Sequence, residues 1–164
     1  MGMRVRILAL CVVLAACEAA DDGGVCDASV IGSPKVQVGE RNADVFLPDA
    51  GTLSVFVPPQ GGIATELDVQ IEGVALEAVE TLRFEVVASD GSSLAVEQYF
   101  GQGLPFVCTM DAGLQIRAVP VAFRDGVQLE GLDGSAVQVQ ATVTWSGGAP
   151  LMTSARVDLV ATDY

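Results

Sequence analysis

Residues 137–145 read VQVQATVTW, a stretch in which apolar and polar side chains alternate without a break. The apolar parity consists of Val137, Val139, Ala141, Val143 and Trp145. Successive side chains of a β-strand point to opposite faces of the sheet, so this alternation predicts a strand with one buried face. Trp145 continues the apolar parity, and we therefore expect it in the core.

Four further stretches alternate in the same way, at residues 53–57, 65–72, 82–86 and 157–161. Two more, at 92–100 and 114–123, are apolar at both parities, which indicates more central strands. Turn sequences separate these stretches: Pro58-Pro59-Gln60-Gly61-Gly62, Ser89-Asp90-Gly91, Asp125-Gly126, Asp133-Gly134 and Ser146-Gly147-Gly148.

No stretch has the period of a long helix, and residues 74–82 predict only one short turn between two strands. One composition prevails and no repeat occurs, so we expect a single domain. The pattern predicts an all-β fold, an antiparallel β-sandwich of seven or eight strands. A small β-barrel is the alternative.

The composition excludes several kinds of chemistry. The 164 residues contain no histidine, so nucleophile pairs with His, His-ligated metals and an imidazole base are excluded. Eight Lys and Arg stand against 21 Asp and Glu, which argues against nucleic-acid binding because phosphate contacts need clustered basic residues. Ser-Lys catalysis would depend on the single lysine, Lys35.

The N-terminal segment has the features of an export signal. Arg4 and Arg6 precede an apolar run at residues 7–16, which is too short to span a bilayer as a helix. The run ends in Leu14-Ala15-Ala16-Cys17, which resembles the lipobox of bacterial lipoproteins. The resemblance implies that Cys17 is lipidated and becomes the first residue of the mature chain. An ordinary secretory signal is the alternative.

The lipoprotein interpretation divides the chain into a signal peptide at 1–16, a lipidated tether at 17–34 and a β-sandwich domain at 35–164. Two or three acyl chains are enough for stable anchoring, so the first expected partner is a membrane. Glu18 after the lipidated cysteine favours, by the same resemblance, the outer membrane. We expect a cell-envelope location, on the periplasmic side or the cell surface, with an envelope protein as a possible partner.

Two cysteines remain after processing, Cys26 and Cys108. Export places them in an oxidising compartment, where they are expected to pair. The closed loop spans 82 residues of sequence, for which the chain-entropy model gives about 4.5 kcal/mol as an upper estimate. A soft copper site at Cys108 and Met110 is a weaker alternative.

Glu66, Asp68 and Glu72 form the most pointed chemical feature. They share one parity of one predicted strand, so they are expected on the same face, with neighbours about 6.6 Å apart. This acidic stripe could bind Ca²⁺ or a basic partner. Alternatively it is a solvated face whose charges discourage edge-to-edge aggregation. A glycosidase carboxylate pair is disfavoured because aromatic residues are scarce.

Other features have simpler explanations. The Asp-Gly pairs could each offer one calcium ligand, and Pro59-Gln60-Gly61-Gly62 could let a ligand approach the backbone, but both are typical of plain turns. Trp145, Tyr99 and Phe100 could form a small recognition patch. None of these features implies a cofactor.

The domain also resembles uncharacterised secreted lipoproteins of myxobacterial type, over about residues 36–164. The resemblance rests on Pro59-Gln60-Gly61-Gly62 before a strand and on Val157-Asp158-Leu159-Val160-Ala161 near the end. It implies an immunoglobulin-like sandwich and no particular activity. We therefore expect a membrane-anchored, non-catalytic structural or interaction protein, with a module for Ca²⁺ or a glycan as the alternative.

Overall fold

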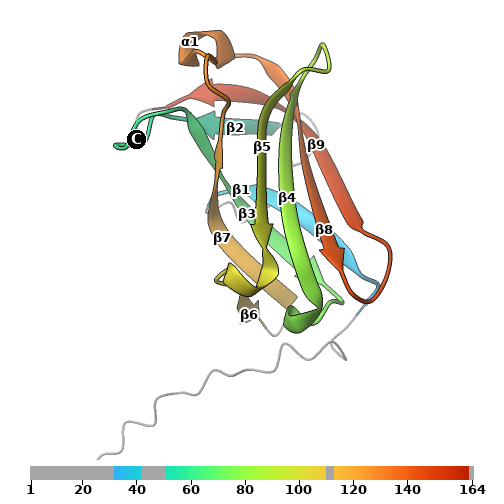
Figure 1. Cartoon of the computed structure of the whole chain (residues 1–164). Coiled ribbons are helices and arrows are strands. Elements are labelled where there is room, and N and C mark those ends of the chain that lie inside the picture. Colours follow the sequence, from blue (N-terminus) through green and yellow to red (C-terminus); the bar gives the residue numbers. More distant parts are fainter. Residues whose placement is uncertain (1–31, 42–50, 110–112, 163–164) are drawn as a thin grey trace, which may run out of the picture.

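The computed structural model describes residues 32–41, 51–109 and 113–162, in which two β-sheets face each other (Figure 1). The described strands are β1 (Lys35–Glu40), β2 (Gly51–Val55), β3 (Ala64–Glu72), β4 (Val79–Ala88), β5 (Ser93–Phe100), β6 (Val107–Thr109), β7 (Gly113–Ala122), β8 (Ala136–Trp145) and β9 (Leu151–Ala161). Short helical turns occur at η1 (Leu76–Ala78), η2 (Gly101–Gly103) and α1 (Leu129–Leu132). The predicted turn within residues 74–82 is confirmed as η1.

The strand order identifies the architecture. Sheet A has the order β1-β3-β7-β6 and sheet B the order β2-β9-β8-β4-β5. Neighbours are antiparallel except β2 and β9, which run parallel. In an immunoglobulin variable-type sandwich, strands A, B, E and D form one sheet, and C, F and G form the other with C′ added. Sheet A matches the first set, and β4, β8, β9 and β5 match the second. The predicted antiparallel, immunoglobulin-like sandwich is confirmed.

The described residues form nine strands rather than the expected seven or eight. The difference comes from β1 and from the three-residue β6, whose alternation is too short to predict a strand. The hallmark cysteines of antibody domains are missing from β3 and β8. Phe84 of β4 is instead the largest fully buried side chain, and it fills space between the two sheets.

The core is formed by the side chains at the alternate strand positions that are apolar in the sequence. Fully buried side chains from both sheets meet there, including Leu53, Leu67, Ile71, Phe84, Val139 and Leu159. The alternation over residues 53–57 predicts that Val57 is buried with Leu53 and Val55, but its side chain is 48% exposed. The reason is that β2 ends at Val55 and the chain then turns, so the alternation no longer places Val57 on the inner face.

Trp145 also differs from the expectation. It is half-buried and packs against the edge of the core, next to the turn that joins β8 to β9. Its indole Nε1 donates a hydrogen bond to the Ala149 carbonyl at 2.9 Å. A Cβ on Gly147 would overlap the indole ring, so a glycine is needed where the turn crosses it. Trp145 therefore secures the turn as well as the core.

The two ends of the sandwich differ. At one end, isolated bridges join Phe56 to Ala64 and Ala95 to Phe123, so β2 meets β3 and β5 meets β7. These bridges link the two sheets at that end, as in a barrel. The other end carries η1, η2 and β6, and we call it the η end (Figure 1). The described strands form two separate sheets and not one closed sheet, so the barrel alternative is wrong.

Candidate functional site

The acidic stripe lies on β3, which is an inner strand of sheet A. Glu66, Asp68 and Glu72 alternate with the core residues of that strand, as the sequence predicts. Glu66 and Glu72 are half-buried, and Asp68 is only 9% exposed. Carboxylates at this depth need partners, because burying an unpaired charge is costly.

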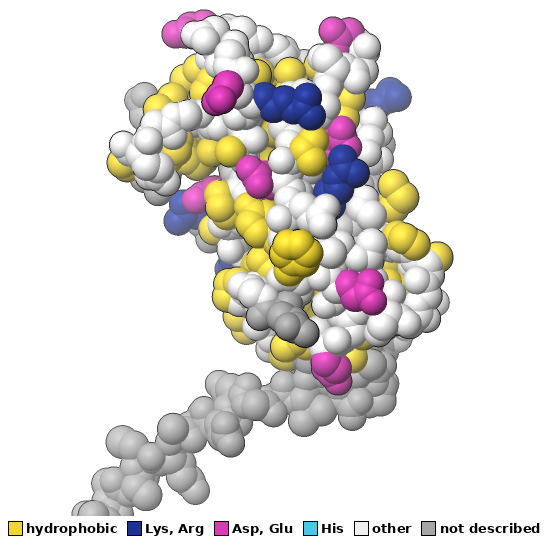
Figure 2. Space-filling model, viewed as in Figure 1, with side chains coloured by type: hydrophobic (Ala, Val, Ile, Leu, Met, Phe, Trp, Pro, Cys, Tyr) yellow, Lys and Arg dark blue, Asp and Glu magenta, His cyan; other side chains and the backbone are white. Residues whose placement is uncertain are grey.

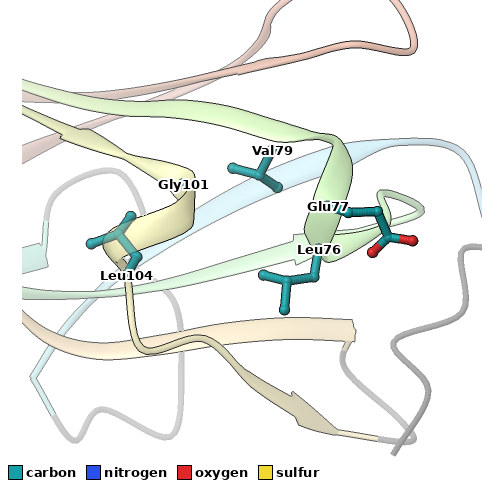
Figure 3. Close-up of a pocket in the computed structure, with 5 residues that line it drawn as sticks. All are labelled: Leu76, Glu77, Val79, Gly101 and Leu104. Atoms are coloured by element: carbon teal, nitrogen blue, oxygen red, sulfur yellow. The ribbon is translucent and has the colours of Figure 1, made fainter. Parts of the chain in front are cut away.

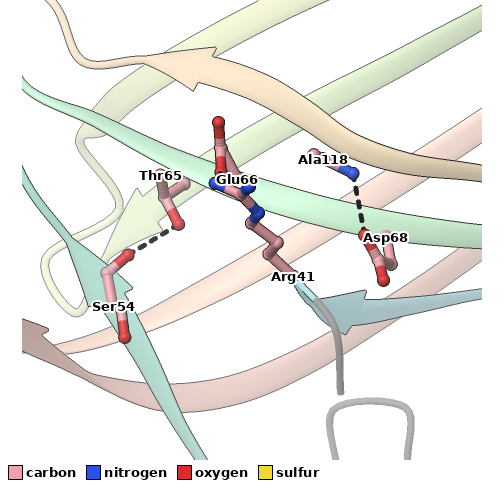
Figure 4. Close-up of polar contacts among 6 residues, drawn as sticks. All are labelled: Arg41, Ser54, Thr65, Glu66, Asp68 and Ala118. Atoms are coloured by element: carbon pink, nitrogen blue, oxygen red, sulfur yellow. Dashed lines mark hydrogen bonds and ion pairs between the residues drawn. The ribbon is translucent and has the colours of Figure 1, made fainter. Parts of the chain in front are cut away.

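Arg41, directly after β1, is the partner of Glu66. The guanidinium Nη1 lies 2.6 Å from Glu66 Oε2, and the Arg41 backbone N–H donates to the Glu66 carbonyl at 3.2 Å (Figure 4). The arginine side chain is 49% exposed and that of Glu66 is 17% exposed. This pair fastens the end of β1 to β3.

Asp68 has a structural task at an irregularity of the sheet. The pairing of β3 with β7 shifts register between Leu67 and Val69, where β7 contains one extra residue. Ala118 in this bulge has φ of 54°, in the left-handed region that is unfavourable for alanine. Its backbone N–H donates to Asp68 Oδ1 at 2.8 Å (Figure 4). The carboxylate thus satisfies a backbone donor that the bulge removes from the ladder.

The bulge also explains the pattern of residues 114–123. Leu114 and Ile116 face the core before it, whereas Val119 and Val121 face the core after it. The apolar parity switches at the bulge, so the stretch appears apolar at both parities in the sequence. The predicted strand is confirmed, and the mixed pattern marks a register shift within it.

Glu72, the third member of the stripe, binds Lys35. The lysine Nζ lies 2.9 Å from Glu72 Oε1, which also accepts a hydrogen bond from Gln70 Nε2 at 3.1 Å. The single lysine of the chain therefore closes the first pair of the β1–β3 ladder, where Lys35 stands opposite Glu72.

Each carboxylate of the stripe therefore has a partner within the protein. The described residues contain no group of three or more acidic, cysteine or histidine side chains that could hold a metal ion. The geometry favours the view that the stripe fastens strands together, and it gives no support to a cation site.

Two Asp-Gly segments and the Gly61-Gly62 segment likewise have their polar groups bonded within the protein. Asp90 Oδ1 accepts the Ser92 N–H at 2.8 Å, and hydrogen bonds from Ser92 lower the pKa of Asp90. Asp133 Oδ1 accepts the Ala161 N–H at 2.9 Å. Gly61 and Gly62 have φ of 86° and 81°, and the Gly61 N–H donates to the Pro58 carbonyl at 2.8 Å. The segments at 58–62 and 89–91 have the geometry of plain turns. Asp133-Gly134 differs from the expectation, because it ends α1 and is hydrogen-bonded to β9.

The three aromatic residues that could form a recognition patch do not gather. Tyr99 faces inward and its ring meets Phe84 edge-to-face, with centroids 6.3 Å apart. Its hydroxyl donates to the Pro120 carbonyl of sheet A. Desolvation, with the nearby Glu97 charge, raises the pKa of Tyr99. Phe100 follows on the opposite parity and is 70% exposed, whereas Trp145 has the core parity of β8.

The outer surface of sheet B is a feature that the sequence reasoning did not single out. Three cross-strand rows, which we call the B face, place the following side chains side by side: Phe100, Thr81 and Thr144; Gln98, Arg83, Thr142 and Met152; Val96, Glu85, Gln140 and Ser154. Strands lie about 4.8 Å apart, so a four-strand row is about 14 Å wide. The sequence signal for this face is the set of polar residues that alternate with the apolar ones in 137–145, since they are expected on the outer side of the strand.

Amides, hydroxyls and a few apolar side chains dominate the B face. The Thr81 and Thr144 hydroxyls lie 2.6 Å apart, and Arg83 Nη2 lies 2.9 Å from Glu85 Oε2. Met152 is 70% exposed. On the side of the molecule that carries β4 and β5, acidic and basic side chains are scattered among neutral and hydrophobic ones (Figure 2). This surface suits contact with another macromolecule more than concentration of an ion.

A small pocket lies at the η end, with a volume of about 210 Å³. Leu76, Val79 and Leu104 point into it, whereas the Glu77 carboxylate points away (Figure 3). Gly101 forms part of its wall, where a Cβ would overlap the Val79 carbonyl. The lining has no nucleophile or general base directed into the pocket.

Cys108 lies in β6, at the edge of sheet A. It is half-buried and packs against the core. Its predicted partner Cys26 and the lipidation site Cys17 lie outside the described residues, as does Met110, so these assignments stay predictions. Among the described residues, no helix has the length and apolar character that a membrane crossing requires.

Comparisons with known proteins add little to this geometry. No protein-family model and no curated protein matches the sequence. Among solved structures, the chain is similar to murine CRIg, with 8% sequence identity and a TM-score of 0.38 over 80% of this chain and 99% of that chain. The fold assignment rests on the strand order described above.

Proposed function

We propose that this chain is a bacterial envelope lipoprotein whose immunoglobulin-like domain is a non-catalytic interaction module, held at a membrane by lipid on Cys17. The proposal rests first on Leu14-Ala15-Ala16-Cys17, which follows a basic and then an apolar segment. Within the domain, the observation that supports an interaction role is the B face.

The B face supports partner binding through its composition and its breadth. Its charged residues Arg83 and Glu85 neutralise each other, which lowers the cost of removing water from the face. Exposed Phe100 and Met152 flank the neutral rows. Large apolar side chains with adjacent polar groups are typical of protein-binding surfaces, in which a few side chains contribute most of the affinity. We therefore favour an envelope protein as the partner.

A disulfide between Cys26 and Cys108 is part of the proposal. Val36, Ile71, Leu114 and Cys108 are paired in sequence across sheet A, so Val36 and Cys108 are three strand spacings, about 14 Å, apart. The ten residues from Cys26 to Val36 can span at most about 35 Å when extended, so the pairing is within reach. The bond would leave about eight residues of free tether, or at most about 28 Å.

The experiment combines acylation with site-specific cross-linking in the native envelope. Labelled palmitate is expected to enter the wild-type chain and not the Cys17→Ala variant. A photo-crosslinking amino acid at Thr142, in the centre of the B face, is expected to form an adduct with another protein. The matched position is Gln115 on the outer side of sheet A, where no adduct is expected.

Absence of palmitate from the wild-type chain would refute the anchoring. Equal adducts from positions 142 and 115 would refute the assignment of the B face. The disulfide is tested separately by alkylating the mature chain with and without prior reduction and measuring its intact mass. The same number of alkylated cysteines in both samples would exclude the bond.

A further inference from the structure

Three Asp-Gly pairs lie among the described residues, in different surroundings: Asp90-Gly91, Asp125-Gly126 and Asp133-Gly134. In such a pair the glycine nitrogen can attack the side-chain carboxyl of the aspartate, because glycine has no side chain to shield its backbone. In a folded protein the attack depends on how firmly two groups are held, the glycine N–H and the aspartate carboxylate. The same dipeptide therefore differs in reactivity from one place in the fold to another.

Both groups of Asp90-Gly91 are held. The Gly91 N–H donates a hydrogen bond to the Ala88 carbonyl at 2.9 Å, and Asp90 Oδ1 accepts the Ser92 N–H at 2.8 Å. The Ala88 N–H also donates to the Ser92 carbonyl at 2.8 Å, which closes the hairpin around the pair. An attack on the Asp90 carboxyl would have to break the first two of these bonds.

Both groups of Asp133-Gly134 are held as well, and by another element. The Gly134 N–H donates to the Leu159 carbonyl at 2.8 Å, and Asp133 Oδ1 accepts the Ala161 N–H at 2.9 Å. Both partners belong to β9, so this pair reacts only when the segment between α1 and β8 detaches from that strand.

Asp125-Gly126, in the turn between β7 and α1, lacks these restraints (Figure 1). Within the part of the chain that the structure describes, no acceptor bonds to the Gly126 N–H and no donor bonds to the Asp125 carboxylate. Both residues are exposed, and a Cβ on Gly126 would meet nothing within 4 Å beyond its chain neighbours. The hydrogen bond across the turn, from the Val127 N–H to the Arg124 carbonyl, is long at 3.3 Å.

We propose that Asp125 is a site of spontaneous isoaspartate formation, from which the fold protects Asp90 and Asp133. The Gly126 nitrogen bonds to the side-chain carboxyl carbon of Asp125. The N–H proton and the carboxyl hydroxyl leave as one water, which gives a five-membered succinimide ring. Water then opens the ring at either carbonyl. One product is aspartate again, and the other is isoaspartate, in which the backbone runs through the former side chain. The reaction needs no oxidant and no co-reactant besides water.

The modified residue would add one carbon to the backbone between two fixed points. Before the turn, the Arg124 N–H donates to the Leu94 carbonyl at 2.9 Å, beside the bridge from Ala95 to Phe123. After the turn, Val127 packs against the core. Isoaspartate at position 125 is therefore expected to weaken the link between β5 and β7, which joins the two sheets at this end.

The test is peptide mapping of the folded chain after incubation for weeks at physiological temperature and pH. Cleavage at glutamate separates the described pairs into peptides 86–97, 98–130 and 131–164, and it places Asp22-Gly23, which lies outside the described residues, in 19–40. Fragment ions from cleavage of the Cα–Cβ bond locate the isoaspartate. A parallel sample in guanidinium chloride reports the reactivity of each pair without the fold. Asp125→Glu is the control variant, since glutamate would have to form a larger ring.

In the folded chain, isoaspartate is expected to accumulate at Asp125 faster than at Asp90 or Asp133 by about tenfold or more, because each protected pair must first lose two hydrogen bonds. The three rates should converge in guanidinium chloride, and the modified fraction should unfold at a lower urea concentration than the unmodified one. Equal rates in the folded chain, or a difference that persists unchanged in denaturant, would overturn the inference. No step involves lipid or a partner, so either result leaves the proposed function as it stands.

Discussion

The outer surfaces of the two sheets use their polar side chains differently. On sheet A, charged side chains are committed to holding strands: Arg41 and Lys35 fasten β1 to β3, and Asp68 supports the bulge in β7. On sheet B, the outward rows consist mainly of amides and hydroxyls that bond to neighbours on the same surface. The comparison teaches that the acidic stripe of β3, which is the most prominent charge pattern of the sequence, contributes to stability. The uncharged polar side chains of sheet B form the surface that is open to a partner.

The largest effect is expected at Asp68. Asp68→Ala leaves the Ala118 N–H without its acceptor in a nearly buried bulge, so the free energy of unfolding should fall by about 1–3 kcal/mol. Urea denaturation followed by circular dichroism measures this change. Asp68→Asn keeps an acceptor oxygen in the same place and should restore most of the stability. Equal losses in both variants would show that charge, and not the hydrogen bond to the bulge, matters.

The hydrogen bond of Tyr99 joins sheet B to sheet A, so removing it compares the stability gained between the sheets with that gained within sheet A. Tyr99→Phe removes the hydrogen bond to the Pro120 carbonyl and should cost about 1 kcal/mol at neutral pH. Burial raises the pKa of Tyr99 in the folded state above its unfolded value of about 10. Its contribution is therefore complete below that pH and is lost as the pH rises through the folded-state pKa.

The measurement is the stability difference between the wild-type chain and Tyr99→Phe at pH 7 to 11. The difference should shrink towards the alkaline end. A difference that is constant over this range would mean that the Tyr99 hydroxyl titrates normally and is not held in the folded state.

Arg41→Ala tests how much an ion pair at the margin of sheet A contributes. The guanidinium is half exposed, so water and salt screen its attraction to Glu66, and a loss below about 1 kcal/mol is expected. The loss should decrease when the salt concentration rises. A loss that does not depend on salt would point to packing of the arginine stem as the main contribution.

The smallest effect is expected on the B face. Thr142→Ala changes an outward side chain on β8, for which the free energy of unfolding should stay within about 0.5 kcal/mol of the wild-type value. If the face binds a partner, the same variant should weaken co-purification of the cross-linked protein. A large loss of stability would break the contrast between the two sheets.

Sequence periodicity was sufficient to predict most of this fold. The alternation in residues 65–72 correctly placed Thr65 with the core residues, where its hydroxyl donates to the Ser54 carbonyl at 2.8 Å (Figure 4). Alternation failed where a strand ended or changed parity, at Val57 and at Ala118. The bulge leaves apolar residues at both parities of residues 114–123, but a central strand gives the same pattern, so the sequence alone does not distinguish the two.

The sequence also predicted the common face of Glu66 and Asp68 but not what they do there. Their partners come from other strands: Arg41 is 25 positions away from Glu66, and Ala118 is 50 positions away from Asp68. Whether a carboxylate is available to an ion depends on such distant contacts. The B face was overlooked for a related reason, since its rows exist only when four strands are placed side by side.

The parallel pairing of β2 with β9 has a mechanical consequence. Gly51 stands opposite Val157 and Val55 opposite Ala161, so the leading end of β2 and the trailing end of β9 lie at opposite ends of the ladder. Tension applied between the start of β2 and the end of β9 draws these two strands past each other along their length. All the hydrogen bonds between β2 and β9 then bear the load together, so this pair resists pulling better than an antiparallel pair that is peeled apart bond by bond.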